Sequence, residues 1–223
     1  LYIMAQRPWI HIINTFEANT RGSNRKMLSL VTDTYAKLSV GVADADILLL
    51  HNLLEPHYIA YRQVSMDYDV VAGNREGGTL AFEQVMDSVP MEVRKWESGV
   101  RAVYYEDTPE ERAIFPNKRN PFLKGTYEER LSAIGALKQK LNTIPALAST
   151  HALVQSFYTM AMGTRLAQQQ DEGSLAQISD LREQQRVLVA DTLYGVLGSL
   201  MFKYRSSREH IDNYFDLTLL RSK

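Results

Sequence analysis

The sequence contains no cysteine among its 223 residues. This absence excludes disulfide bonds, thiolate metal sites, iron–sulfur clusters and a cysteine nucleophile. It leaves the compartment open, because a reduced cytoplasmic protein and an exported or surface-associated protein without disulfides both fit it.

Long apolar runs and an excess of charge of one sign are also missing. No stretch approaches the roughly 20 apolar residues that a membrane-spanning helix needs, so we expect no transmembrane segment. The formal net charge is −1, which gives no overall positive field to attract nucleic acid or an anionic membrane. Apolar residues make up 45% of the chain, enough for a substantial hydrophobic core at this length.

Most of the chain has the apolar spacing of helices. Three- and four-residue steps between apolar side chains predict helices over residues 24–38, 43–71, 79–105, 127–141, 146–170 and 174–204.

Clusters of turn residues separate these predicted helices. GNREGG at 73–78 and DEGS at 171–174 are typical of turns, and FPNKRNPFLKG at 115–125 is typical of a linker between two modules. Pro56 and Pro90 lie inside predicted helices, where proline removes a hydrogen bond, so we expect a kink or break at each.

Two similar nonapeptides stand 103 residues apart. RGSNRKMLS at 21–29 and KGTYEERLS at 124–132 both contain a basic residue, glycine, serine or threonine, and then Leu-Ser. Ser23 and Thr126 are suited to cap the first turn of a helix, and Thr126 with Glu129 has the spacing of a capping box. Each nonapeptide therefore predicts a helix start.

The similarity continues beyond these starts and indicates an internal duplication. It runs without a gap as far as Arg62 and Arg165, and each half closes with a capping-box spacing, TPEE at 108–111 and SSRE at 206–209. We therefore predict an all-α fold of two tandem, duplicated up-and-down bundles, each with three long helices and one short helix. Module 1 would cover residues 21–117, and module 2 residues 118–223.

The first 20 residues differ from the rest. PWIHIINTF at 8–16 has no helical spacing, and one short strand cannot form a sheet, so we expect residues 1–20 to form an extended arm. An exposed apolar arm favours contact with a protein partner. The candidate interaction residues are Trp9, Ile10, Ile12, Ile13 and Phe16.

The two nonapeptides, AIFPNKRNPF at 113–122 and the ending YFDLTLL at 214–220 together resemble a group of uncharacterised bacterial proteins with tandem four-helix modules. The resemblance covers residues 20–223 and implies the same modular fold. These motifs are helix caps and turns, so the resemblance implies no activity.

His51, Glu55 and His57 lie within seven positions and are the candidate metal ligands. His51 and Glu55 share a helix face, whereas His57 points away from it on an ideal helix, although a kink at Pro56 could turn it inward. The matching positions of the second half carry apolar or aromatic residues. We therefore expect a packing role for these three residues and keep metal binding as the alternative.

No motif predicts an enzyme. GNREGG lacks the Lys-Ser/Thr of a phosphate loop, and the Glu-x-x-His spacing of di-iron bundles is missing from the chain. We expect a non-enzymatic helical scaffold or interaction protein without a cofactor, which self-associates or joins a larger assembly through its arm. The alternative is a helical bundle that binds a metal or small ligand at His51, Glu55 and His57.

Overall fold

The computed structural model describes Asn14, Phe16 and residues 23–220. These residues form helices and turns and contain no β-strand, which confirms the all-α class. Over the same residues, no helix has the length and apolar character needed to cross a membrane.

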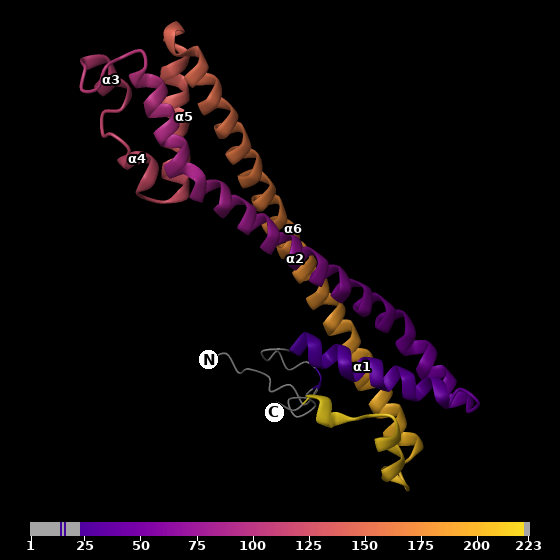
Figure 1. Ribbon diagram of the computed structural model, residues 1–223. Coiled ribbons are helices and arrows are strands. Elements are labelled where there is room, and N and C mark those ends of the chain that lie inside the picture. The colour runs from indigo at the N-terminus through magenta and orange to yellow at the C-terminus, as the bar shows by residue number, and fades with distance from the viewer. Residues whose placement is uncertain (1–13, 15, 17–22, 221–223) are drawn as a thin grey trace, which may run out of the picture. The chain divides into compact units, whose positions relative to one another are not determined.

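Two long helices and several short ones make up the fold (Figure 1). The α-helices are α1 (Ser23–Val40), α2 (Ala45–Arg101), α3 (Pro109–Ile114), α4 (Asn120–Leu123), α5 (Tyr127–Asn142) and α6 (Ala148–Lys203). Short 3₁₀ helices are η1 (Pro145–Leu147), η2 (Arg208–Asn213) and η3 (Leu217–Leu220).

The long helices α2 and α6 have 57 and 56 residues and run without a break through both expected turns. The predictions of a turn at residues 73–78 and at 171–174 are therefore wrong. Glycine costs a helix only about 1 kcal/mol relative to alanine, so continued hydrogen bonding and packing can override it. Pro56 and Pro90 also lie inside α2 and do not end it.

The described residues fall into two compact units. Unit 1 contains the described residues up to Val70 together with those of Ala176–Lys223, and unit 2 is Val71–Leu175. Each long helix thus contributes one part to each unit. This division differs from the expected modules at 21–117 and 118–223. Each expected module folds back on itself at a turn, at residues 73–78 or 171–174, whereas α2 and α6 continue as helix through these residues.

The core of unit 1 forms where α1 packs on the first part of α2 and the last part of α6 (Figure 1). Its fully buried side chains include Leu30 and Leu38 from α1, Leu54 and Tyr61 from α2, and Leu193 and Leu200 from α6. Leu193 and Leu200 lie on the face of α6 that the sequence predicts to be apolar. Burial raises the pKa of Tyr61 to about 12, because it disfavours the ionised phenolate.

The core of unit 2 forms between α5, the last part of α2 and the first part of α6. Trp96 is fully buried at its centre and makes edge-to-face contacts with Phe122 and Phe157, at centroid distances of 6.4 and 5.4 Å. Aromatic pairs in this orientation stabilise a core beyond the area they bury.

An ion-pair cluster attaches the segment after α2 to unit 2. Glu97 of α2 and Glu111 of α3 are both buried, and Arg101 bonds to them at 3.1 and 3.3 Å. Arg119 pairs with the second oxygen of Glu97, and Glu106 pairs with Arg101 at 2.8 Å. Buried carboxylates need such partners, so the cluster fixes the chain between α2 and α4.

Helix caps follow the sequence in part. Thr126 and Glu129 form the expected capping box, in which the Glu129 N–H donates to Thr126 Oγ1 and the Thr126 N–H donates to Glu129 Oε2. Thr108 accepts the N–H of Glu111 at 3.3 Å as expected. The capping box expected at 206–209 does not form, because η2 is a 3₁₀ helix whose N-cap, Ser207, makes no side-chain cap bond.

Candidate interaction groove

The structure brings two of the three candidate metal ligands together around Tyr35. The His51 ring stacks on the Tyr35 ring at 4.7 Å, and Glu55 Oε1 accepts the Tyr35 hydroxyl at 2.9 Å. That bond, together with burial, raises the pKa of Tyr35. His57 is half-buried, and no group of three or more His, Asp or Glu side chains that could hold a metal occurs in the described part of the chain.

The predicted arm is described at two of its residues. Phe16 is buried in the core of unit 1 and stacks on Phe215 at 5.9 Å, so it anchors the chain instead of facing a partner. Asn14 Nδ2 donates to Asp191 Oδ1 of α6 at 3.1 Å. The remaining candidate interaction residues, Trp9, Ile10, Ile12 and Ile13, lie outside the described residues.

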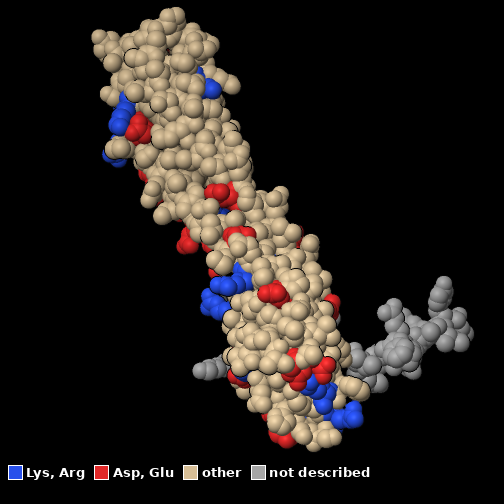
Figure 2. Space-filling view, turned by 90° about the vertical axis from the view of Figure 1, so that its right-hand side faces the viewer, with Lys and Arg blue, Asp and Glu red and all other residues tan. Residues whose placement is uncertain are grey.

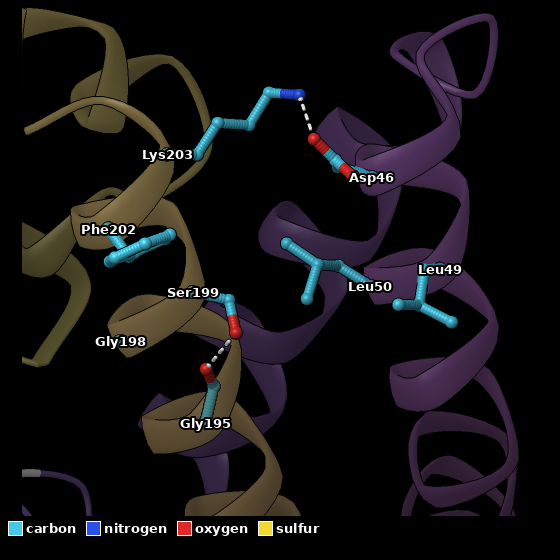
Figure 3. Close-up of a pocket in the computed structure, with 8 residues that line it drawn as sticks. All are labelled: Asp46, Leu49, Leu50, Gly195, Gly198, Ser199, Phe202 and Lys203. Carbon is cyan, nitrogen blue, oxygen red and sulfur yellow. Dashed lines mark hydrogen bonds and ion pairs between the residues drawn. The ribbon is translucent and has the colours of Figure 1, made fainter.

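Unit 1 has an open groove of about 540 Å³ between the start of α2 and the end of α6 (Figure 3). It is lined by Asp46, Leu49 and Leu50 from α2, and by Gly195, Gly198, Ser199, Phe202 and Lys203 from α6.

The floor of the groove is open because α6 carries small residues there. A Cβ atom at Gly195 or Gly198 would meet nothing within 4 Å, so no neighbouring atom requires a glycine at either position. Ser199 Oγ donates to the Gly195 carbonyl at 3.0 Å, which satisfies its hydroxyl within the helix. The floor therefore presents backbone and small side chains and leaves space for an incoming group.

Large apolar side chains border this floor. Leu49 is 69% exposed and Phe202 is 73% exposed, whereas Leu50 between them is buried. Figure 3 shows Leu50 pointing from α2 toward α6. Isolated exposed apolar residues are ordinary on a surface, but a contiguous apolar hollow is typical of a binding site.

One end of the groove is closed by charges. Lys203 Nζ bonds to Asp44 Oδ1 and to Asp46 Oδ2, both at 2.7 Å. The two carboxylates raise the pKa of Lys203, and the bond to Lys203 lowers the pKa of Asp44. This exposed cluster contributes little stability, but it sets the spacing between the start of α2 and the end of α6.

Sequence reasoning identified the buried face of α6 but missed this groove. Periodicity counts apolar residues, and Gly195 and Gly198 do not register as apolar positions. The available signal was a pair of glycines three residues apart in an apolar helix, followed one turn later by Phe202.

Charges do not gather around a second kind of site on the visible surface. Figure 2 shows acidic and basic side chains interspersed over the described residues of one face. No basic area on that face is large enough to follow a phosphate backbone.

The apolar part of the groove lining is suited to contact an apolar group. Its one hydroxyl, on Ser199, bonds to a backbone carbonyl, and its one amine, on Lys203, is paired with two carboxylates. Comparisons with protein-family models, with curated proteins and with solved structures found no match for this chain.

Proposed function

We propose that this protein is a non-enzymatic helical interaction protein that self-associates or joins a larger assembly, and that the groove of unit 1 is its contact surface. The observation that carries the proposal is the exposure of Leu49 and Phe202 on either side of a floor without large side chains. An apolar segment placed there would remove both side chains from water. Burial of a leucine or phenylalanine contributes roughly 1.5–3 kcal/mol.

The apolar border extends beyond the groove along both helices. Leu53 follows Leu49 by four residues on α2, and Leu188 precedes Phe202 by two seven-residue steps with Gly195 between them; Leu53 and Leu188 are also exposed. Seven-residue spacing keeps side chains on one seam of a helix. Such a seam supports docking of another elongated segment.

We also propose that the two halves of the chain are copies of one helical segment. α2 and α6 begin 103 residues apart, at Ala45 and Ala148, and have nearly equal lengths. Positions 38 and 141, and positions 54 and 157, are buried in both halves. The groove does not repeat, because the position that matches Leu49 is Ala152. Binding is therefore assigned to unit 1 alone.

Sedimentation velocity over a range of protein concentrations tests the proposed function. We expect the wild type to associate as concentration rises, and a Leu49→Glu, Phe202→Glu double variant to remain monomeric. Both side chains are mostly exposed, so the double variant should keep its helical circular dichroism. The matched control is Tyr105→Glu, which changes an 84% exposed side chain of unit 2 and should leave association unchanged.

Two results contradict the proposal. One is a wild type that remains monomeric over the whole concentration range and also sediments as a monomer in the extract of the cells that produce it. The other is a double variant that associates as strongly as the wild type.

A further inference from the structure

We infer that the occupant of the groove is the same face of a second copy, with the two α6 helices antiparallel and related by a two-fold axis. The Phe202 ring of each copy lies on the floor at Gly195 of the other. This inference rests on the proposed function, because it assigns a specific partner and a specific geometry to the same contact surface.

One face of α6 carries both a projecting side chain and a hollow that can receive it. Phe202 is 73% exposed, and a Cβ atom at Gly195 or Gly198 would meet nothing within 4 Å. These three residues follow one another at steps of three and four, so they share one side of the helix (Figure 3). Phe202 cannot reach Gly195 of its own helix, which lies about 10 Å away along the axis. A second copy can therefore fill the hollow where the chain's own ring cannot.

The spacing of these residues fits an antiparallel pair. Phe202 lies three residues after Ser199, and Gly195 lies three residues before Gly198. A two-fold axis between Gly198 and Ser199 therefore brings Phe202 of each copy opposite Gly195 of the other. The side chains at the axis itself are small, and the distance between two packed helices depends on the side chains at their contact. The two α6 helices can thus approach closely.

The wall of the groove on α2 adds apolar contacts to the inserted ring. Leu49 and Leu50 line the groove, and Leu49 is 69% exposed. The Phe202 ring of the second copy enters between this wall and the floor of α6. Because a two-fold contact uses the same surface on both copies, both grooves are filled at once and every contact occurs twice.

Charges at the two ends of this face favour the antiparallel direction. Arg205 follows Phe202 by three residues and is exposed, and its guanidinium carbon lies 5.4 Å from the centre of the Phe202 ring. Asp191 precedes Gly195 by four residues and is also exposed; its Oδ1 accepts a bond from Asn14, and a carboxylate can accept several. In the antiparallel pair, Arg205 of each copy lies beside Asp191 of the other. A parallel pair would place Arg205 beside Arg205, and like charges in contact disfavour association.

The end of α6 limits the size of this contact. Lys203 is the last residue of α6 and lies four residues after Ser199, and Tyr194 lies four residues before Gly198. The two helices therefore overlap over residues 194–203, or about 15 Å. Stable, specific interfaces bury at least about 1,200 Å² in total, and smaller ones are typical of transient contacts. We expect a weak, reversible dimer that forms at high protein concentration.

A single cysteine tests the two-fold axis. The chain has no cysteine, and Ser199→Cys places one thiol beside the axis, where it meets the thiol of the second copy. We expect disulfide-linked dimers on mild oxidation at about 100 µM protein. The matched control is Ser174→Cys, because Ser174 is also an exposed serine of α6 whose hydroxyl bonds to the carbonyl four residues earlier, at Gln170. Ser174 belongs to unit 2, so its variant should cross-link several-fold less.

Exchange of the projection and the hollow gives a second test. Gly195→Phe alone places two rings opposite each other, and Phe202→Ala alone leaves the hollow empty, so each variant should raise the dimer dissociation constant several-fold in sedimentation velocity. The double variant Gly195→Phe, Phe202→Ala restores the pair with the roles reversed and should associate nearly as strongly as the wild type. Gly195 has open space around it and Phe202 is mostly exposed, so helical circular dichroism should stay unchanged in all three.

The outcomes separate this inference from the proposed function. A wild type that associates through Leu49 and Phe202, while Ser199→Cys cross-links no more than Ser174→Cys, overturns the inference and leaves the proposed function in place with a different occupant. A double exchange variant that associates as weakly as the single variants also overturns the inference. A wild type that is monomeric at every concentration overturns it as well, and sedimentation in the cell extract then decides the proposed function.

Discussion

Three glycines test whether α2 and α6 are continuous where the sequence favours turns. Gly73 and Gly77 lie in α2, and Gly173 lies in α6. A Cβ atom at any of them would meet nothing within 4 Å. Alanine is favoured over glycine inside a helix by roughly 0.5–1 kcal/mol, because the unfolded glycine chain has more conformations to lose. The triple alanine variant should therefore gain about 1.5–3 kcal/mol of unfolding free energy, with each site acting almost independently.

The matched control is a glycine whose backbone excludes alanine. Gly125 has φ +92° and precedes the capping box of α5, where an added Cβ would contact the Glu129 carboxylate. Gly125→Ala should destabilise the protein by about 1 kcal/mol or more, because the left-handed region disfavours a side chain.

Urea and thermal unfolding followed by circular dichroism measure both effects. For a protein of this size, about 1 kcal/mol shifts the Tm by roughly 2–4 °C, so the triple variant should gain about 3–12 °C. Gly73, Gly77 and Gly173 all belong to unit 2, so a protein that unfolds in two steps should show the gain in the step of unit 2. A loss of stability in the triple variant would refute the continuous helices, because it would place these glycines in turns with positive φ.

Three further predictions concern single side chains. Glu97→Gln should destabilise unit 2 by about 2 kcal/mol in urea unfolding, less than for a fully buried pair because its arginine partners are partly exposed. Thr126→Ala should cost about 1 kcal/mol through loss of the cap of α5, and Thr126→Ser should restore it. Lys203 holds the pKa of Asp44 below its ordinary value of 3.8, so the ion pair stabilises the fold above that pH and is lost as pH falls further. The difference in urea midpoint between wild type and Asp44→Asn at pH 7 should therefore vanish at about pH 2.

Local chemistry in the sequence was enough to predict the helical class and several helix ends. The capping box of Thr126 and Glu129 satisfies backbone N–H groups within its own turn, so its effect can be deduced from four residues. The apolar steps of α6, including Leu193, Val196 and Leu200, also correspond to buried positions. Both signals depend on neighbours in the chain and need no knowledge of the tertiary structure.

The division into units could not be predicted in this way. GNREGG and DEGS favour turns by local preference, but the difference between helix and turn at a few glycines is only a few kcal/mol. Packing on the partner helix can outweigh that difference, and it depends on residues about 90 positions away, such as the Gln168 side chain that donates to Thr79 at 3.3 Å. A prediction from local residue preferences therefore ends each long helix too early.

The groove and the anchor were hidden for a similar reason. Phe16 lies in a segment without helical spacing, which the sequence predicts to be an exposed arm. Its burial depends on contact with Phe215, which is 199 residues away in the sequence. Gly195 and Gly198 form the floor of a groove only because Leu49 and Phe202 also line it, and Leu49 belongs to a different helix. For the candidate metal site, the sequence shows His51 and Glu55 close together but not their contact residue. That residue is Tyr35, which comes from a different helix.

The composition of the two units also sets an order of events during protein synthesis. Unit 2 is one uninterrupted segment that ends at Leu175, so all of it is synthesised before the last part of α6 exists. Unit 1 needs that last part, and Ala176–Lys223 takes roughly 2–10 s to synthesise at 5–20 residues per second. During this interval, Leu30 and Tyr61 lack the part of α6 on which they pack in the finished protein, so the core of unit 1 can form only after that of unit 2 has been synthesised.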